Sequence, residues 1–220
     1  MTKPIDVWLF PEGPNPMKII FALEEIGVPY EIKQIKSEDV RREPLIKLNP
    51  NGRVPVIEDP NTGLVLWESV AILMYLAEKY DKDNALTYTT GNEKHLVNQW
   101  LLFQASGQGP YFGQASWFMR LHPEKLPSAI ERYQNEMKRV TSVLEGHLQG
   151  REWLVGDKIT IADLAWTPYT LVSEILLGRP DHPFLSDYPN VAAWFRKIST
   201  RPSWVKVMEI RSSLMDPSSK

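Results

Sequence analysis

Residues 53–69, with the sequence RVPVIEDPNTGLVLWES, give the strongest indication of the fold of this chain. Its β-branched residues at 54–57 favour a strand, although the proline at position 55 removes one donor from a strand ladder. Turn-forming residues follow at 59–63, and a second apolar run occupies 64–67. The pattern predicts two short strands that are joined by a turn.

A helix is predicted directly after the second strand. Ser69 stands where an N-cap belongs, before the apolar residues 70–76. Glu68 and Ser69 then place a carboxylate and a hydroxyl beside the free N–H groups of a helix N-terminus. Such a set of groups suits a small zwitterionic amino acid. The simpler interpretation is a capped helix that carries an exposed acid.

The residues before this stretch predict a strand, a helix and another strand. Residues 6–10 favour the first strand, and residues 30–35 favour the second. Between them, Asn15 suits the N-cap of the helix, with Pro16 at the first helical position, where a missing N–H costs nothing. A helix between two strands implies a parallel β-α-β unit, so residues 1–82 are predicted to form a thioredoxin-like domain.

Beyond a polar linker at 81–91, the sequence carries almost no strand signal. Apolar residues recur at three-to-four spacing from 130 to 148, as in an amphipathic helix. Thr160 and Asp163 have capping-box spacing, which predicts the start of another helix and gives Asp163 a structural role. Residues 92–220 are therefore predicted to form an all-helical domain, and the fold class is α/β plus all-α.

The composition narrows the function. The formal net charge of −2 gives no reason to expect nucleic acid or an anionic membrane as a partner. Cysteine is absent, which excludes disulfides, thiolate metal sites and a cysteine nucleophile, so a ligand must supply the sulfur for any thiol chemistry. The histidines lack metal-ligand spacing, so no metal is expected. The N-terminus has no signal-peptide pattern and no apolar run is long enough to span a bilayer, which favours a cytoplasmic protein.

Residues 53–69 resemble the glutathione-binding segment of cytosolic glutathione transferases, in which Val-Pro, a strand, a turn and a second strand lead to Glu-Ser. Residues 13–18 and 100–114 are similar to one branch of that family. The branch contains the bacterial Nu-class enzymes and the fungal proteins similar to the yeast nitrogen-regulatory prion protein. The resemblance covers nearly the whole chain, and it implies the glutathione transferase fold, a thioredoxin-like domain followed by a helical one.

The resemblance implies a homodimeric enzyme that binds glutathione as a substrate and stabilises its thiolate. The thiolate would then attack a small hydrophobic electrophile. Relatives of this branch also use glutathione to reduce disulfides or peroxides, and such a reaction here would take all its sulfur from glutathione. The alternative is a non-catalytic glutathione-transferase-like binding module, which would need no thiolate site.

Asn15 is the candidate catalytic residue, because the resemblance implies that its amide points at the glutathione sulfur. A free thiol has a pKa of about 8.5, and lowering it by about two units needs roughly 2.7 kcal/mol. One charge-assisted hydrogen bond of about 1.5–3 kcal/mol and a helix dipole contribution of about 0.3–1 kcal/mol would supply that free energy. The alternative role of Asn15 is a helix cap and nothing more.

The resemblance assigns Glu68 and Ser69 to the γ-glutamyl end of glutathione. Glu68 would accept from the ammonium, while Ser69 and its backbone N–H would donate to the carboxylate. Val54 would pair its backbone with the cysteinyl unit, and a cis bond between Val54 and Pro55 would turn that backbone outward. Arg53 resembles a residue near the glycyl carboxylate; its alternative is an ordinary surface charge.

Two further arginines are candidate glutathione ligands. The family usually has a glutamine or histidine before the second helix, where this sequence has the apolar Val40. Arg41 would bind the glycyl carboxylate instead. Arg132, on the helix at 130–148, would reach the glutathione site of the partner subunit by resemblance to the Nu class, and a solvated surface position is its alternative.

Aromatic residues predict an apolar wall for the electrophile. The candidates are Phe10, Tyr111, Phe112 and Trp117. The last three follow a Gly-Pro break at 107–110, which favours a loop or bend that faces the site. Most aromatic residues in such positions simply belong to a core.

Overall fold

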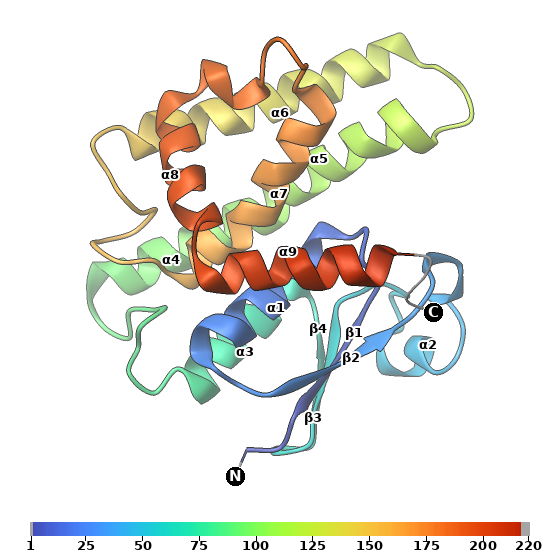
Figure 1. Cartoon of the computed structure of the whole chain (residues 1–220), viewed down its shortest axis with the longest axis vertical. Coiled ribbons are helices and arrows are strands. Elements are labelled where there is room, and N and C mark those ends of the chain that lie inside the picture. Colours follow the sequence, from blue (N-terminus) through green and yellow to red (C-terminus); the bar gives the residue numbers. More distant parts are fainter. Residues whose placement is uncertain (1, 217–220) are drawn as a thin grey trace. The chain divides into compact units, whose positions relative to one another are not determined.

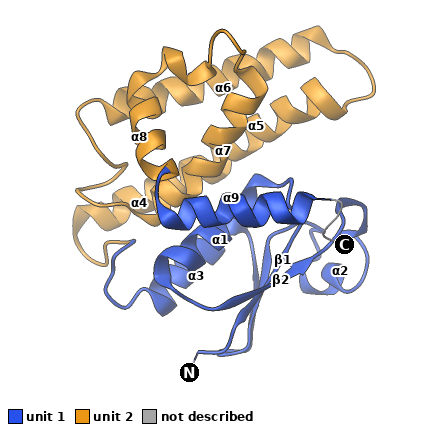
Figure 2. Cartoon of the chain, in the orientation of Figure 1, with its two compact units in different colours: residues 1–86, 200–220 blue, residues 87–199 orange. Residues whose placement is uncertain are grey.

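The computed structural model describes residues 2–216 of the chain. Contacts divide the chain into two compact units, unit 1 with residues 1–86 and 200–220 and unit 2 with residues 87–199 (Figure 2). Unit 1 thus contains the last helix, which the sequence analysis assigned to the helical domain. The domain boundaries at 1–82 and 92–220 stay a prediction about which segments fold on their own.

Unit 1 is built on a four-stranded sheet with the strand order β2-β1-β3-β4. The strands are β1 (Ile5–Leu9), β2 (Tyr30–Gln34), β3 (Val56–Asp59) and β4 (Leu64–Trp67). Strands β1 and β2 run parallel, while β3 is antiparallel to both β1 and β4. The predicted β-α-β unit is therefore confirmed, and so is the predicted strand pair, although its first strand begins at Val56, two residues later than predicted.

The helices of unit 1 are α1 (Pro14–Ile26), α2 (Leu45–Leu48), α3 (Ser69–Tyr80) and α9 (Pro202–Met215), with a short 3-10 helix at Ser37–Asp39. Helix α1 packs against both α3 and α9 (Figure 1). Alternate residues of β1, namely Ile5, Val7 and Leu9, are buried, as the period of two in a strand requires. The core of unit 1 thus lies where α1 covers the sheet.

Both predicted helix caps in unit 1 are wrong by one or two residues. Helix α1 begins at Pro14 with the extended Gly13 as its N-cap, so Asn15 is the second helical residue. The reason is that the ring of Pro14 already presets a helical φ. Helix α3 begins at Ser69 itself, because Glu68 has a φ of 73° and stands as its N-cap.

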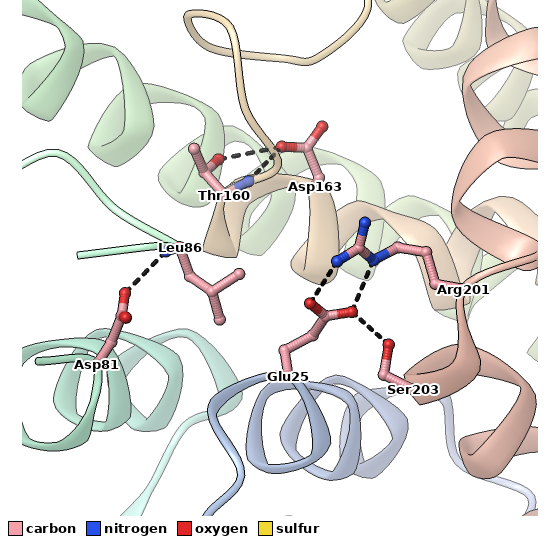
Figure 3. A network of polar contacts seen from close by, with 7 residues as sticks. All are labelled: Glu25, Asp81, Leu86, Thr160, Asp163, Arg201 and Ser203. Atoms are coloured by element: carbon pink, nitrogen blue, oxygen red, sulfur yellow. Dashed lines mark hydrogen bonds and ion pairs between the residues drawn. The ribbon is translucent and has the colours of Figure 1, made fainter. Parts of the chain in front are cut away.

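Polar and aromatic contacts hold α9 on α1 within unit 1. Arg201 forms a bidentate ion pair with Glu25, in which Nε and Nη2 donate to the two carboxylate oxygens at 2.7 Å each. The Ser203 hydroxyl also donates to Glu25 (Figure 3). The rings of Phe21 and Trp204 pack with their centroids 5.3 Å apart. These contacts explain why the last helix groups with unit 1.

Unit 2 is built from helices. They are α4 (Gly91–Phe103), α5 (Gly109–Ser116), α6 (Pro127–Leu148), α7 (Ile161–Leu177) and α8 (Pro189–Ser199). A 3-10 helix at Phe184–Asp187 precedes α8. Helix α6 buries Met137, Val140, Leu144 and Leu148, which is the predicted three-to-four spacing.

The predicted break at 107–110 is wrong, because the backbone stays helical there. Two π-helical turns, Gln104–Gln108 and Trp117–Leu121, flank α5 and continue the helix from α4. Gly107 permits the wide turn, since a Cβ at this position would lie 2.7 Å from the ring of Phe103. The glycine therefore serves close packing inside a helix and does not end it.

The predicted capping box at the start of α7 is confirmed. Thr160 Oγ1 accepts from the backbone N–H of Ala162 at 3.3 Å. Asp163 accepts from the backbone N–H of Thr160 at 2.8 Å, as Figure 3 shows. The buried Asp163 carboxylate also accepts from Leu154 N at 3.1 Å and Trp194 Nε1 at 2.8 Å. Burial raises the pKa of Asp163, and these hydrogen bonds oppose the rise. Asp163 thus has the structural role that its spacing predicts.

Candidate functional site

Three segments of unit 1 meet at one edge of its sheet. Trp8, near the end of β1, pairs with Val56 at the start of β3, and Val56 also pairs with Trp67 at the end of β4. The loop after β1, the segment of Val54 and the segment of Glu68 therefore lie at the same edge. This edge gathers most of the residues that the sequence analysis selected for glutathione.

The side chains of Asn15 and Ser69 meet at this edge. The Ser69 hydroxyl donates to Oδ1 of Asn15 at 3.4 Å, a long hydrogen bond between residues 54 positions apart in the sequence. Among the described residues, the amide nitrogen of Asn15 has no hydrogen-bond partner. Asn15 therefore offers an NH₂ donor at the N-terminus of α1.

The N-terminus of α1 has few backbone donors of its own. Pro14 and Pro16 lack an N–H, so among the first four helical residues only Asn15 and Met17 keep one. Fewer N–H groups can then bind an anion at this end of the helix. The side-chain amide of Asn15 consequently becomes the main candidate donor there.

Lys18 is a residue of this site that the sequence analysis missed. Its side chain is 1% exposed, and its Nζ donates to Ser69 Oγ at 3.1 Å. Burial lowers the pKa of Lys18 from 10.5 to about 7, while the negative charge of Glu68 opposes the shift. The signal in the sequence is its spacing from Asn15, because residues i and i+3 share one face of a helix.

Glu68 is exposed and has a strained backbone between β4 and α3. Its φ of 73° is unusual for a residue that has a Cβ, and such conformations cost about 1–3 kcal/mol. Strained residues of this kind cluster at ligand-binding and catalytic sites. The conformation turns the chain from the sheet into the helix and leaves the carboxylate in solvent.

The backbone of Val54 is held firmly at the same edge. The bond between Val54 and Pro55 is cis, as predicted. The Val54 side chain is buried in an apolar cluster that includes Leu45. Asn49 braces the segment, because its Nδ2 donates to the carbonyl oxygen of Arg53 at 2.7 Å.

Arg41 lies close to the segment that carries Arg53, and both are exposed. A Cβ at Gly52 would lie 2.9 Å from Cγ of Arg41, so the arginine stem crosses this glycine. Val40 packs against the apolar cluster around Leu45. This packing explains why position 40 has an apolar side chain. An exposed arginine in the segment and a second one close to it are a suitable arrangement for a ligand carboxylate.

Phe10 lines a small apolar pocket within unit 1. The pocket lies between the loop after β1 and helix α9, and its lining includes Met17 and Leu214. At the same pocket, Arg211 Nε donates to the carbonyl oxygen of Pro11 at 3.1 Å. Helix α9 thus holds the loop that leads into α1.

The three aromatic candidates of unit 2 lie on helical backbone. Phe112 is 1% exposed and packs edge-on against Tyr169, so it belongs to the core of the unit. Tyr111 is half-buried, with the guanidinium of Arg139 lying 5.9 Å from its ring centroid. Trp117 is 46% exposed. Contact with a ligand stays a prediction for all three, and the burial of Phe112 weighs against direct contact.

Arg132 is an exposed residue on α6 of unit 2. The buried Met137 follows five residues later on the same helix and therefore lies on a different face from Arg132. Its predicted reach into the site of a partner subunit stays a prediction.

Neither a metal site nor a membrane helix is found in residues 2–216. No group of three or more histidine, aspartate or glutamate side chains is arranged there to hold a metal ion. Within the same residues, no helix combines the length and the apolar character that are needed to cross a bilayer.

Comparison with known protein families matches both halves of the chain. The model of the glutathione S-transferase N-terminal domain matches residues 3–78, and the model of the glutathione S-transferase C-terminal domain matches residues 110–202. The glutathione S-transferase-like protein tpcF of Aspergillus fumigatus is 45% identical over 205 residues, which cover 89% of this chain and 91% of tpcF.

Two solved structures from Phanerochaete chrysosporium are similar to this one. The glutathione transferase URE2P6, in complex with oxidized glutathione, has a TM-score of 0.92 and 42% identity, and the match covers 96% of this chain and 98% of that chain. Ure2p5, cocrystallized with 1-(S-glutathionyl)-2,4-dinitrobenzene, has a TM-score of 0.87 and 39% identity over 96% of each chain. These matches confirm the predicted fold class, with a thioredoxin-like N-terminal part and a helical C-terminal part.

Proposed function

Because this chain belongs to the glutathione S-transferase family, we propose that it binds glutathione in unit 1 and transfers the thiolate to a small hydrophobic electrophile. The chain has no cysteine, so glutathione is a substrate that brings the sulfur. The task of the protein is to lower the pKa of that thiol and to hold the sulfur near the electrophile. The thiol proton leaves to water or to a carboxylate of glutathione.

The hydrogen bond between Asn15 and Ser69 is the single observation that carries this proposal. It supports a site in which a donor for the sulfur and a donor for the γ-glutamyl carboxylate lie side by side. A tripeptide that binds along the sheet edge then reaches both groups at once. The amide of Asn15 contributes about 1.5–3 kcal/mol to thiolate stability, which lowers the thiol pKa by about one to two units.

The remaining residues of the sheet edge hold the rest of glutathione. Glu68 accepts from the α-ammonium, and Ser69 donates to the α-carboxylate through its backbone N–H, because its hydroxyl proton is already donated to Asn15. Val54 pairs its backbone with the cysteinyl unit. Arg41 and Arg53 bind the glycyl carboxylate, a role that is supported by the closeness of the Arg41 side chain to Gly52, the residue before Arg53.

The candidates for apolar contact with the electrophile are the aromatic side chains of Phe10 in unit 1 and of Tyr111 and Trp117 in unit 2, whereas Phe112 belongs to the core of unit 2. The conjugate that cocrystallized with Ure2p5 carries a dinitrobenzene ring, which supports a flat apolar substrate for this chain as well. The functional unit is a homodimer, in which Arg132 reaches the glutathione site of the partner subunit. We place the protein in the cytoplasm, where reduced glutathione is abundant.

A second reaction is the glutathione-dependent reduction of a disulfide or a peroxide. The complex of URE2P6 with oxidized glutathione favours it. In disulfide reduction, one glutathione thiolate attacks the disulfide and releases a thiolate, and a second glutathione resolves the mixed disulfide to give oxidized glutathione. All the sulfur then comes from the substrates, as a chain without cysteine requires.

Retention on immobilised glutathione, followed by turnover of 1-chloro-2,4-dinitrobenzene, tests the proposal. The expected result is retention of both the wild type and Asn15→Ala, with turnover lost largely in Asn15→Ala. A wild-type protein that is retained but has no turnover of the aryl halide, a disulfide or a peroxide indicates a binding module. Absence of retention contradicts glutathione binding altogether.

A further inference from the structure

A buried lysine connects to both donors of the proposed glutathione site. Lys18 Nζ donates to Ser69 Oγ at 3.1 Å, and the Ser69 hydroxyl donates to Oδ1 of Asn15 at 3.4 Å. Two successive hydrogen bonds thus connect the side chains of Lys18, Ser69 and Asn15, from the interior of unit 1 to the edge of its sheet. The roles proposed above for Asn15 and Ser69 do not explain why a lysine is buried beside them.

The chemistry of these groups fixes the direction of the hydrogen bonds. An ammonium has donors and no acceptor, so Ser69 must accept from Lys18. The one proton of the Ser69 hydroxyl then goes to Asn15, which must present its oxygen to receive it. The NH₂ group of Asn15 is consequently turned away from Ser69 and is left for another acceptor.

We propose that Lys18 is a positioning residue for the thiolate, because its ammonium orients the Ser69 hydroxyl and thereby holds the Asn15 amide with its NH₂ group toward the glutathione sulfur. The inference rests on the proposed function and deepens it by naming what orients the sulfur donor. Without the ammonium, the Ser69 oxygen can accept from the NH₂ group of Asn15, and the amide can turn over. A turned amide presents its oxygen to the thiolate and repels it.

The environment of Lys18 fits a functional cation. The side chain is 1% exposed, and an apolar residue of similar length would fill the same space without the desolvation cost of a charge. Among the described residues, Glu68 at the junction of β4 and α3 is the titratable group whose charge acts on Lys18. Since burial lowers the pKa of Lys18 to about 7, the orienting charge is present in only part of the molecules at neutral pH. A bound γ-glutamyl carboxylate on Ser69 favours the charged form.

The test measures the pKa of the thiol of bound glutathione from the ultraviolet absorbance of the thiolate. The proteins are the wild type, Lys18→Met, Asn15→Ala and the double variant. We expect Lys18→Met to raise the bound thiol pKa by about one unit, which means an about tenfold lower ratio of thiolate to thiol at a given pH. We expect the double variant to match Asn15→Ala, because Lys18 acts through the same amide.

Lys79→Met is the matched control, since it removes an exposed lysine from α3 of the same unit and should leave the thiol pKa unchanged. Equal thiol pKa values in the wild type and Lys18→Met overturn the inference. A thiol pKa in the double variant that is raised by the sum of the two single shifts overturns it as well. In either case a lowered thiol pKa in the wild type leaves the proposed function standing. A wild-type protein that leaves the thiol at its free pKa overturns both.

Two further measurements separate positioning from a merely structural role. Affinity for S-methylglutathione, which has no ionisable thiol, should fall by less than about threefold in Lys18→Met, because the peptide contacts remain. Lys18→Gln keeps a donor for Ser69 without the charge, and we expect it to recover about half of the lost pKa shift. A Lys18→Gln protein that shifts the thiol pKa as far as Lys18→Met contradicts orientation by donation.

Discussion

The hydroxyl of Ser69 donates to Oδ1 of Asn15 at 3.4 Å, and this contact joins the first residue of α3 to the first turn of α1. The N-terminal ends of two helices therefore meet at one edge of the sheet. Both macrodipoles favour an anion there. Because two prolines remove N–H groups from the start of α1, the proposed stabilisation of the glutathione sulfur depends on the side chain of Asn15 more than on the helix backbone.

Asn15→Ala should lower kcat/KM for 1-chloro-2,4-dinitrobenzene by about 10- to 100-fold, because the substitution removes one charge-assisted hydrogen bond to the thiolate. The KM for glutathione should change little, because the amide acts on the thiolate and the peptide contacts remain. Steady-state kinetics at pH 6.5 measure both quantities, with the exposed Asn92→Ala as the control. A raised KM with an unchanged kcat would show that Asn15 only binds the substrate.

Glu68→Gln should raise the KM for glutathione by about tenfold, because a neutral amide replaces the carboxylate that accepts from the ammonium. The side chain keeps its shape, so the backbone at φ 73° is undisturbed. Kinetics with varied glutathione check this expectation, and Glu78→Gln, an exposed acid on α3, should behave as the wild type. Unchanged affinity in Glu68→Gln would place the ammonium elsewhere.

Lys18 should make the stability of the protein depend on pH. The pKa of Lys18 is about 7 in the folded chain, whereas the ordinary value, which applies to the unfolded chain, is 10.5. Between pH 7 and pH 10.5 the unfolded chain therefore binds more protons than the folded chain. The free energy of unfolding therefore rises with pH through this window, and the cost of burying the charge is fully present below pH 7. Urea unfolding from pH 6 to 9.5 should show the wild type gaining stability relative to Lys18→Met as pH rises. A constant difference would mean that Lys18 keeps an ordinary pKa.

Arg201→Ala should destabilise the protein by about 2 kcal/mol, because it leaves the partly buried Glu25 carboxylate without its bidentate partner. Urea unfolding measures the change. Lys206→Ala is the control on the same helix, since it removes an exposed pair with Glu209 whose N···O distance is 3.7 Å, and it should cost less than about 0.5 kcal/mol. Equal effects of the two substitutions would contradict a special role for Arg201 in holding α9.

Local patterns allowed the strand pair at 54–67 and the capping box at Thr160 to be predicted, because both depend on residues close in sequence. The cap of α1 was misplaced for a local reason too, since a single proline shifts the helix start. The break predicted at Gly107 was wrong for a different reason. Position 107 requires a small residue because the ring of Phe103 packs close to it. The local pattern of glycine and proline residues does not show this contact.

The features that depend on distant residues were beyond sequence reasoning. A lysine is ordinarily exposed, so the spacing of Lys18 from Asn15 is a weak signal, and the contact of Lys18 with Ser69, 51 positions away, is what connects it to the candidate site. The grouping of α9 with unit 1 depends on Glu25 and Arg201, which lie 176 positions apart. Such contacts follow from tertiary packing, whereas the pattern of apolar residues specifies only which face of each helix is buried.

The decisive measurement of thiolate stabilisation at this sheet edge is the pKa of the thiol of glutathione bound to the wild-type protein. Ultraviolet absorbance of the thiolate, titrated against pH with saturating protein and compared with glutathione free in the same buffer, gives this value. The predicted result is a midpoint about one to two units below that of free glutathione. A midpoint equal to that of free glutathione would contradict the claim that the edge formed by Asn15 and Ser69 stabilises a thiolate.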